Sequence, residues 1–317
     1  MSDAPKEPAD LTIALWATNL ARPLNGIDAW AAAVDAQMAE ACGQGADLFV
    51  MPEYASAQWL SFAPPDLSPD REVPWMADQA PKALDAVRPL AAKHGMALLA
   101  GTMPWRLDEA SADAPAEVNR AWLILPDGTI HAQDKLCLTP GEKDPLAWQL
   151  TVGHTLTLVR WRGLTVAIAI CLDVELPALS AKLAPHAPDL LLVPSMTEKR
   201  AGFHRVNSCA RARAVELQAA VLTCGCIGDA ATGKPREGNT GGAAVYLPSE
   251  PELGHVGIAA ETGLMAESDD AGPLLIHRLP FAKMAGLRAG GAEVWPGAWN
   301  AAAVNIAWAG DKPDNQA

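Results

Sequence analysis

The fold class of this chain is decided by the stretch LTVAIAICLDVELP, residues 164–177. Its first part, Leu164–Ile170, is apolar and rich in β-branched side chains, which is typical of a buried strand. Asp173 and Pro177 then mark a turn that leads toward a helix. Cys171 stands at this strand-to-helix corner. The stretch therefore predicts an α/β fold with a thiol at the end of a central strand.

Two other apolar runs end in an ionisable side chain in the same way. Residues 47–52 lead into Glu53, and residues 130–134 lead into Lys135. A carboxylate, an ammonium and a thiol such as Cys171 are sufficient for nucleophilic hydrolysis of a C–N bond. Because each group follows its own strand-like run, we expect the three side chains to converge in one pocket.

Short apolar runs alternate with amphipathic stretches from residue 11 to about residue 280, which predicts one α/β domain. Strands are expected at Leu11–Trp16, Leu48–Met51, Met96–Gly101, Ala121–Leu125, Leu156–Trp161, Leu164–Ile170, Leu190–Val193, Ala219–Thr223 and Ala243–Leu247. Helices are expected at 27–43, Pro81–Lys93, Pro177–Leu183 and Phe203–Gln218. We expect a flexible segment over residues 1–9, the domain over 10–290, and a C-terminal extension and tail over 291–317.

The composition excludes several classes of protein. The 317 residues are 50% hydrophobic and carry a net charge of −13, which argues against binding to nucleic acid or to anionic membranes. No apolar run is long enough to cross a membrane, and the N-terminus has no signal-peptide core. The six cysteines are too few for a disulfide framework in a chain of this length. We therefore expect a reduced, cytoplasmic protein.

The sequence predicts no metal and no cofactor. The seven histidines have no ligand spacing, and neither GxGxxG nor a phosphate-binding loop is present. Cys224 and Cys226 lie in an apolar run and are expected to pack in the core. Cys137 is the one rival nucleophile, but its place between Leu136 and Leu138 favours a structural role.

Three segments resemble the signatures of the nitrilase-type carbon–nitrogen hydrolases. FVMPEYAS (49–56), DKLCLTPGE (134–142) and AIAICLDVELP (167–177) are similar to the glutamate, lysine and cysteine motifs. Later segments at 187–195, 211–216 and 241–246 match in the expected order, so that the resemblance covers roughly residues 10–290. CLDVELPALS and VPSMTEKRAGFHRV look most like the branch sometimes fused to an acetyltransferase domain, although the chain is too short to include such a partner.

The resemblance implies a fold, an assembly and a set of roles. The fold is a four-layer α-β-β-α sandwich in a single domain, and the assembly is a homodimer or a larger even oligomer. Glu53 matches the general base, Lys135 the oxyanion-stabilising lysine and Cys171 the nucleophile. Glu142 matches a second glutamate near the lysine, and the backbone N–H of Leu172 would complete the oxyanion hole.

The implied activity is hydrolysis of a small amide through a cysteine thioester. A lysine ammonium beside the thiol favours the thiolate, and each strong oxyanion donor contributes about 3–4 kcal/mol. The residues that follow the catalytic segments, Tyr54, Trp59, Met196 and Thr197, are expected to line the substrate pocket. An Ala-rich face of the helix Phe203–Gln218, with Ala210 and Ala214, is expected at the dimer interface.

Several alternatives stay open. A nitrilase or an N-carbamoyl hydrolase would use the same three groups, and a catalytically silent scaffold would belong to the same family. A thiol redox protein is disfavoured because Cys171 has no resolving cysteine near it in the sequence. Leu172, Ala178 and Leu217 depart from the residues that the family pattern usually has at these positions. These departures leave the substrate undetermined.

Overall fold

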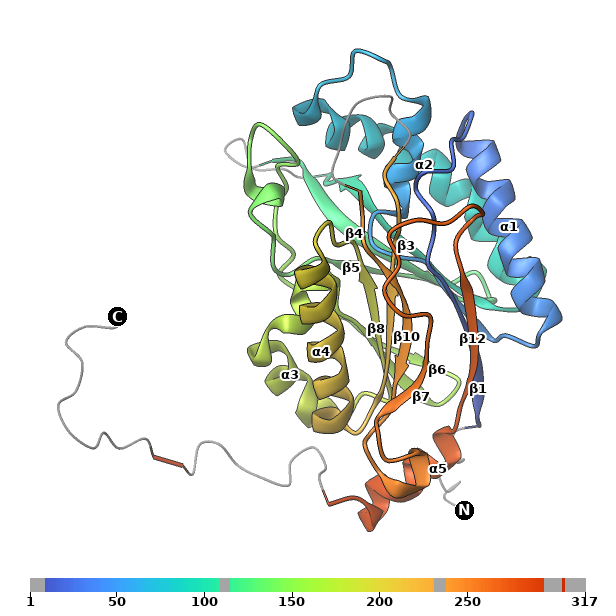
Figure 1. Cartoon of the computed structure of the whole chain (residues 1–317), viewed down its shortest axis with the longest axis vertical. Coiled ribbons are helices and arrows are strands. Elements are labelled where there is room, and N and C mark those ends of the chain that lie inside the picture. Colours follow the sequence, from blue (N-terminus) through green and yellow to red (C-terminus); the bar gives the residue numbers. More distant parts are fainter. Residues whose placement is uncertain (1–8, 109–114, 231–237, 294–303, 306–317) are drawn as a thin grey trace.

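The computed structural model describes residues 9–108, 115–230, 238–293 and 304–305. Two six-stranded sheets lie face to face, and Figure 1 shows α1 and α2 on one side of the pair and α3 and α4 on the other. The predicted four-layer α-β-β-α sandwich, in a single domain, is therefore confirmed. The segment 1–8 and most of the extension 291–317 lie outside the described residues.

The first sheet has the strand order β12-β1-β2-β3-β4-β5. Neighbours β1, β2 and β3 are parallel, whereas β12, β4 and β5 join as antiparallel strands at the two sides. The strands are β1 (Leu11–Trp16), β2 (Leu48–Val50), β3 (Ala97–Arg106), β4 (Glu117–Ile124), β5 (Ile130–Asp134) and β12 (Leu274–Leu279).

The second sheet repeats this plan with the order β11-β10-β9-β8-β7-β6. Its central strands β7, β8 and β9 are parallel, and β6, β10 and β11 are antiparallel to their neighbours. The strands are β6 (Leu158–Trp161), β7 (Leu164–Ile168), β8 (Leu190–Ser195), β9 (Ala220–Gly225), β10 (Gly242–Tyr246) and β11 (Ile258–Glu261).

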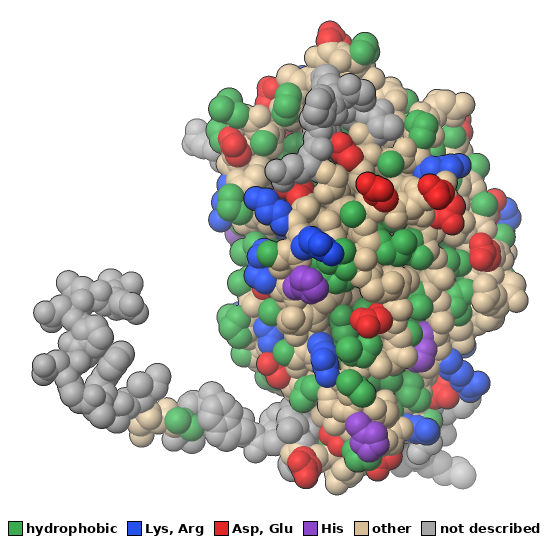
Figure 2. Space-filling model, in the orientation of Figure 1, with side chains coloured by type: hydrophobic (Ala, Val, Ile, Leu, Met, Phe, Trp, Pro, Cys, Tyr) green, Lys and Arg blue, Asp and Glu red, His purple; other side chains and the backbone are tan. Residues whose placement is uncertain are grey.

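Helices α1 to α4 cover the outer faces of the sheets, and α5 lies at one end of the molecule (Figure 1). The α-helices are α1 (Ile27–Gly43), α2 (Pro69–His94), α3 (Pro177–Leu183), α4 (Arg200–Leu217) and α5 (Phe281–Gly286), and the latter continues into a π-helical turn at Leu287–Gly291. In the part of the chain that the structure describes, none of these helices is long and apolar enough to cross a membrane. On the face drawn in Figure 2, basic and acidic side chains are interspersed over the surface.

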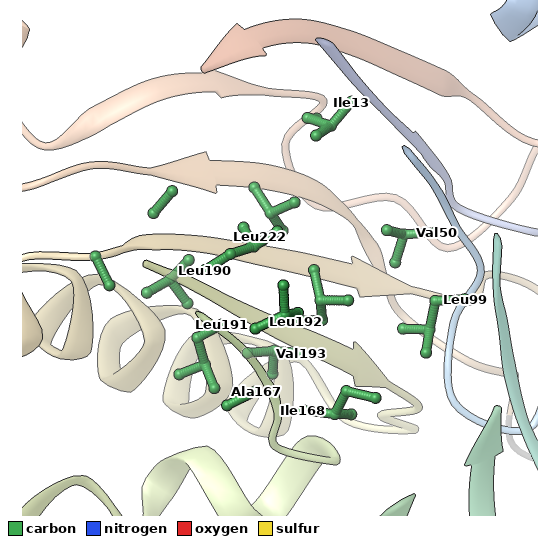
Figure 3. Packing of buried hydrophobic residues seen from close by; sticks show 14 of the residues in the cluster. Ile13, Val50, Leu99, Ala167, Ile168, Leu190, Leu191, Leu192, Val193 and Leu222 are labelled. Atoms are coloured by element: carbon green, nitrogen blue, oxygen red, sulfur yellow. The ribbon is translucent and has the colours of Figure 1, made fainter. Parts of the chain in front are cut away.

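Alternation along the first sheet separates its two faces. Ile13 and Val50 point toward the second sheet, whereas Trp16 and Phe49 point toward α1 and α2. The period of two is the side-chain periodicity of a strand. Strand β8 is instead buried on both faces along its whole length, as expected of a parallel strand between a sheet and a helix layer. Figure 3 shows the side chains of both sheets meeting in this core.

The predicted strands are all present with small shifts at their ends, and the largest difference concerns α2. The sequence predicts this helix over Pro81–Lys93, but it begins at Pro69 and includes Pro74, Pro81 and Pro89. Pro81 and Pro89 lie on the exposed side, where a missing N–H group and the proline ring disturb no packing. The buried side keeps its helical period through all three prolines, because tertiary packing outweighs local preference.

Candidate active site

Glu53 follows strand β2 in a sharply bent segment of the chain. Tyr54 has a left-handed backbone (φ 48°), and its N–H donates to Oγ1 of Thr102 at 2.8 Å. Strand β3 passes this turn closely at Gly101 (φ 67°), where a Cβ atom would lie 2.3 Å from the carbonyl oxygen of Pro52. Only glycine fits this position. The bend turns the Glu53 side chain into the interior, where 1% of it is exposed.

Lys135 directly follows strand β5, and its backbone N–H donates to the carbonyl oxygen of Asn119 on strand β4 at 2.9 Å. This bond extends the antiparallel pairing of β4 and β5 by one residue. The lysine side chain is 2% exposed, which is unusual for an ammonium group without a partner. A buried ammonium group such as that of Lys135 is stable only when carboxylates lie close to it.

Cys171 lies just beyond strand β7 and opens the 3-10 turn Cys171–Glu175. Its backbone is left-handed (φ 49°), a conformation that costs free energy for a residue with a Cβ atom and recurs at functional sites. The turn is braced from helix α4, where the guanidinium Nε of Arg213 donates to the carbonyl oxygen of Val174 at 3.1 Å. The predicted strand-to-turn corner at the thiol is present.

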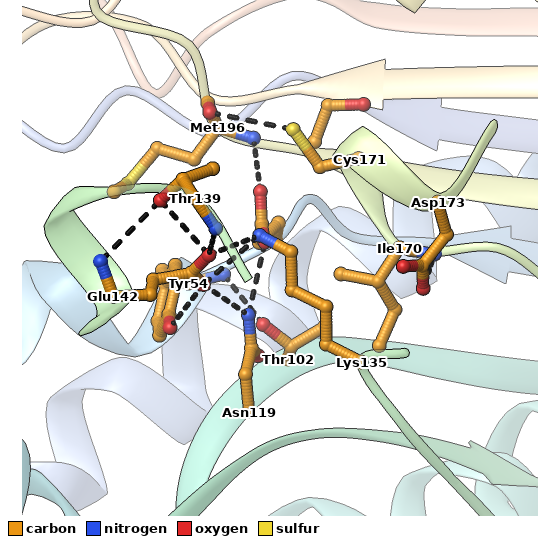
Figure 4. A network of polar contacts seen from close by, with 12 residues as sticks. Tyr54, Thr102, Asn119, Lys135, Thr139, Glu142, Ile170, Cys171, Asp173 and Met196 are labelled. Carbon is orange, nitrogen blue, oxygen red and sulfur yellow. Dashed lines mark hydrogen bonds and ion pairs between the residues drawn. The ribbon is translucent and has the colours of Figure 1, made fainter. Parts of the chain in front are cut away.

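The three predicted residues Glu53, Lys135 and Cys171 lie in one network of polar contacts, in which Figure 4 labels Lys135 and Cys171. Nζ of Lys135 donates to Oε1 of Glu53 at 2.7 Å and to both carboxylate oxygens of Glu142 at 2.7 and 2.9 Å. The N–H of Met196 donates to Oε2 of Glu53 at 2.8 Å, and the Cys171 thiol lies 3.6 Å from the carbonyl oxygen of the same Met196. The backbone of Met196 thus contacts both the Glu53 carboxylate, through its N–H group, and the Cys171 thiol, through its carbonyl oxygen.

The carboxylate–lysine cluster, made of Glu53, Lys135 and Glu142, holds two glutamates in different environments. Besides the lysine, Glu142 accepts hydrogen bonds from Tyr54 Oη, Asn119 Nδ2, and the N–H and Oγ1 of Thr139. Burial opposes the charge on Glu142, but the ammonium and these donors lower its pKa below the usual value. The lysine's pKa is raised, against the effect of burial, by the two carboxylates. Glu142 and Lys135 therefore form a permanent ion pair.

Glu53 has fewer donors and remains able to exchange a proton. Burial raises its pKa, the Lys135 ammonium opposes this, and the negative charge of Glu142 adds to the rise. When the environments of two carboxylates shift their pKa values in opposite directions, one can serve in an ion pair and the other in acid–base chemistry. Here Glu142 suits the first role and Glu53 the second. The raised pKa of Glu53 suits this carboxyl group to exchange a proton.

The Cys171 thiol differs from the expectation that a nearby ammonium favours the thiolate. Burial and the charge of Glu53 raise its pKa well above the usual value, and the opposing effect of Lys135 is smaller. The resting group is therefore a neutral thiol. The Glu53 carboxylate lies within hydrogen-bonding distance of this thiol and could accept its proton.

A cavity of about 600 Å³ opens above the thiol. Three of the four residues expected to line it do so, namely Tyr54, Met196 and Thr197, and Leu172 also lies at the cavity wall. The expectation for Trp59 is wrong. Its ring is fully buried and packs edge-on against Trp30 of α1 at 5.3 Å. Ala57 and Leu60 of the same 3-10 segment line the cavity, so Trp59 lies on the other side of this segment, toward α1.

Other cysteines do not compete with Cys171. The described residues that line the cavity do not include Cys137, Cys224 or Cys226. Burial raises the pKa values of Cys224 and Cys226 well above the usual value of a thiol, so both remain neutral in the core. Among the described residues, no group of three or more metal-binding side chains gathers at one place.

Two buried polar residues of the site were absent from the sequence prediction. Asn119 donates to Oε1 of Glu53 at 2.9 Å and to Oε1 of Glu142 at 3.3 Å, and so it lies between the two carboxylates. Asp173 accepts hydrogen bonds from the backbone on either side of the site. Asn119 lies on strand β4, next to Lys135 in the sheet, and Asp173 lies two residues after the thiol. These two positions were the only signals available in the sequence.

A comparison with known families decides the classification. The sequence profile of the carbon–nitrogen hydrolases matches residues 16–254. The chain belongs to the carbon–nitrogen hydrolase family. The matched residues include the segments that carry Glu53, Lys135, Glu142 and Cys171, which the structure brings together in the site described above.

Curated relatives within the family are of moderate similarity. A probable hydrolase, YhcX of Bacillus subtilis, is 28% identical over 216 residues, which is 68% of this chain and 40% of that protein. The omega-amidase YafV of Escherichia coli is 28% identical over 190 residues, which is 60% of this chain and 65% of that protein. The alignments thus span less than two thirds of either relative's length.

Solved structures of the family share the fold. An amidase from Nesterenkonia sp. AN1 superposes with a TM-score of 0.65 at 21% identity, over 89% of this chain and 95% of that one. That structure is of a mutant in which the acetamide moiety of fluoroacetamide is covalently bound to the active-site cysteine. At this level of identity the similarity establishes the common sandwich.

Proposed function

We propose that this carbon–nitrogen hydrolase cleaves the C–N bond of a small amide through a thioester on Cys171 and releases ammonia or an amine. The observation that carries the proposal is the contrast between the two buried glutamates. Glu142 is held as a permanent anion by Lys135, whereas burial raises the pKa of Glu53 beside the thiol. A base with a raised pKa next to a neutral thiol is suited to take and return one proton.

In the first half of the reaction, the thiol proton passes to Glu53 as the sulfur attacks the amide carbon. The negative charge then develops on the amide oxygen. Lys135 donates one N–H to Glu53 and shares a second between the two oxygens of Glu142, which leaves the third for this oxyanion. The N–H of Leu172, at the start of a helical turn without a partner inside that turn, is the second donor.

In the second half, the protonated Glu53 gives its proton to the nitrogen of the leaving amine. Collapse of the tetrahedral intermediate breaks the C–N bond and leaves a thioester. Glu53 then takes a proton from a water molecule as this water attacks the thioester carbon. When the C–S bond breaks, the proton returns to sulfur, and the carboxylic acid leaves. One water is consumed and the site regains its starting protonation.

The experiment that tests this proposal is a measurement of ammonia release from primary amides, N-carbamoyl compounds and nitriles by wild type and Cys171→Ala. We expect at least one primary amide to be hydrolysed by wild type and not by the variant. An omega-amidase and an amidase among the similar proteins make dicarboxylic acid monoamides and short aliphatic amides the first compounds to try. Turnover of nitriles or N-carbamoyl compounds alone would replace the amide by that substrate class, and no turnover of any compound would favour the scaffold alternative.

Three further properties are proposals. The branch sometimes fused to an acetyltransferase domain is supported by the CLDVELPALS and VPSMTEKRAGFHRV segments, and the alignment covers 40% of YhcX. A cytoplasmic location is supported by the net charge of −13 and by six cysteines that are all free. Fractionation of the native cells would test the location.

The third property that we propose is assembly into a homodimer or a larger even oligomer. The reason first given for placing α4 in the interface needs correction, because Ala210 and Ala214 are buried against the chain's own sheet. The outward face of α4 instead presents Ser208 and Ala212, small exposed side chains that permit close approach of a second subunit. Light scattering at micromolar concentration should give a multiple of 33.3 kDa, and a mass of one chain would refute the assembly.

A further inference from the structure

Asp173 is a fully buried carboxylate that lies close to the thiol but does not line the cavity formed by the described residues. Its Oδ2 accepts a hydrogen bond from the N–H of Ile170 at 3.1 Å, and its Oδ1 from the N–H of Cys137 at 2.8 Å. The N–H of Leu136 lies 3.2 Å from both oxygens. Three backbone donors thus converge on one side chain.

These donors belong to the two halves of the site. Leu136 and Cys137 directly follow Lys135, which the first sheet delivers from strand β5. Ile170 directly precedes Cys171, which the second sheet delivers from strand β7. One carboxylate therefore ties the backbone next to the ammonium to the backbone next to the sulfur.

The charge of Asp173 is costly where it stands. Burial raises its pKa to about 7, against the opposing effects of the three N–H groups and the Lys135 ammonium. Among the described residues it has no direct ion-pair partner that would offset this cost. Hydrogen bonds from N–H groups to a carboxylate are about twice as strong as those to a neutral acceptor. The ionised Asp173 carboxylate thus holds the segment after Lys135 firmly to the segment before Cys171.

We propose that Asp173 is a positioning residue that sets the distance between the Lys135 ammonium and the Cys171 sulfur. The inference rests on the proposed function, because this distance matters only if both groups act on one substrate atom. When the connection is lost, the ends of the two sheets can shift relative to each other. The two oxyanion donors, one from each side, then no longer reach the same point, and a misplacement of about 1 Å can cost two orders of magnitude in rate.

Asp173→Asn tests this with almost no change in volume. An asparagine has one acceptor oxygen, and its NH₂ group must then face either the N–H of Ile170 or that of Cys137. One half of the connection is therefore replaced by a contact between two donors. The rate constant kcat should fall about 30- to 100-fold, while KM changes less than about threefold because the cavity lining is unchanged.

The matched control is Asp189→Asn at the other end of the same sheet. Asp189 also accepts a backbone N–H, from Thr165 at 2.7 Å, and pairs with Arg288 at 2.6 Å. Its replacement should lower the melting temperature but leave kcat within about twofold of wild type. Loss of kcat in both variants in proportion to lost stability would show that Asp173 is merely structural.

A second readout needs no substrate and separates this inference from the proposed function. The rate of Cys171 alkylation by iodoacetamide, followed by peptide mass spectrometry, reports the thiolate fraction. Because Lys135 lowers the pKa of the thiol, a displaced ammonium in Asp173→Asn should move the pH midpoint of alkylation upward, and Asp189→Asn should not. An unchanged midpoint and an unchanged kcat would overturn the positioning role. A wild type that hydrolyses no amide would refute the proposed function and leave the alkylation comparison intact.

Should Asp173→Asn fail to fold, amide hydrogen exchange in wild type still tests the connection. The N–H groups of Leu136, Cys137 and Ile170 should be protected to the same extent as those of strand β7, although all three residues lie outside the strands. Fast exchange at Cys137 and Ile170 would show that the carboxylate does not hold the two segments, and would overturn the proposal.

Discussion

The two sheets have the same plan but make unequal contributions to the site. The first sheet delivers Glu53 from β2 and Lys135 from β5, and with them Asn119 and Glu142, so it contributes nearly all of the charge. The second sheet contributes the thiol of Cys171 on a strained turn and a stretch of backbone at Met196. The comparison indicates that the charged groups of the site are organised on one side and that the proposed nucleophile is presented from the other.

The contacts between these halves are few. Side chains inside the carboxylate–lysine cluster contact one another directly at 2.7–2.9 Å. Across the halves, the described hydrogen bonds near the site are those of Met196 with Glu53 and of Asp173 with Leu136 and Cys137. The first half is therefore a pre-formed network, and its alignment with the thiol depends on these cross-connections.

The largest effect should come from removing the one reactive group of the second half. Cys171→Ala should lower kcat/KM at least about 10⁴-fold, because no other group in the cavity forms the thioester. Ammonia release measured over hours checks this. Cys137→Ser, which changes a cysteine outside the cavity lining, should keep wild-type activity. Inactivation by Cys137→Ser with activity retained in Cys171→Ala would reverse the assignment.

Removing the base of the first half should separate hydrolysis from nucleophile reactivity. Glu53→Gln should lower kcat/KM about 10³-fold because the thiol proton and the leaving amine lose their shared carrier. Alkylation of Cys171 by iodoacetamide at pH 7 should nevertheless become faster, since the charge of Glu53 raises the pKa of the thiol. Slower alkylation in Glu53→Gln would mean that the carboxylate generates the thiolate in the resting enzyme.

Within the carboxylate–lysine cluster, Glu142→Gln should have a smaller effect of a different kind. The negative charge of Glu142 raises the pKa of Glu53, so its removal should lower that pKa. The acid limb of the pH profile of kcat/KM should therefore move to lower pH, with a loss of about 10-fold at the optimum because Lys135 is less firmly held. An acid limb that moves to higher pH would contradict the division of roles between the two glutamates.

The smallest effect concerns stability and the Asp173 connection. Because the folded-state pKa of Asp173 is about 7, above its value of 3.8 in an unfolded chain, the folded protein binds the extra proton between these pH values. The stabilisation that the folded protein gains from protonated Asp173 is therefore fully present below about pH 4 and is lost as the pH rises through about 7. The difference in unfolding free energy between wild type and Asp173→Asn should narrow from pH 5 to pH 8 in urea titrations. A difference that widens over this range would indicate a pKa below the usual value.

The central strands and the convergence of Glu53, Lys135 and Cys171 could be predicted from local sequence. Runs such as Leu164–Ile170 are buried on both faces, and each ends at a polar corner, so composition alone reveals them. Strands β11 and β12 were not predicted. Their side chains are partly exposed and do not alternate clearly between polar and apolar, which leaves no periodic signal.

The supporting residues could not be predicted because their roles depend on distant partners. Asn119 lies 66 positions from Glu53, and Asp173 lies 36 positions from Cys137. Nothing near either residue in the sequence indicates these contacts. Trp59 was assigned to the cavity from its closeness to Glu53 in the chain, but its side chain packs against Trp30 of α1 while its neighbours Ala57 and Leu60 line the cavity. The resting protonation of Cys171 likewise depends on burial, which only the assembled sandwich determines.

The central claim is that the thiol from the second sheet becomes acylated while the first sheet moves the proton. The most direct measurement is peptide mass spectrometry of wild-type enzyme that is quenched with acid during turnover of its best amide. We predict the mass of the acyl group on the peptide that contains Cys171, its removal by hydroxylamine, and one ammonia or amine released for each acid formed. An acyl group on another residue, or ammonia release without any acylated Cys171 under conditions that preserve thioesters, would contradict the account.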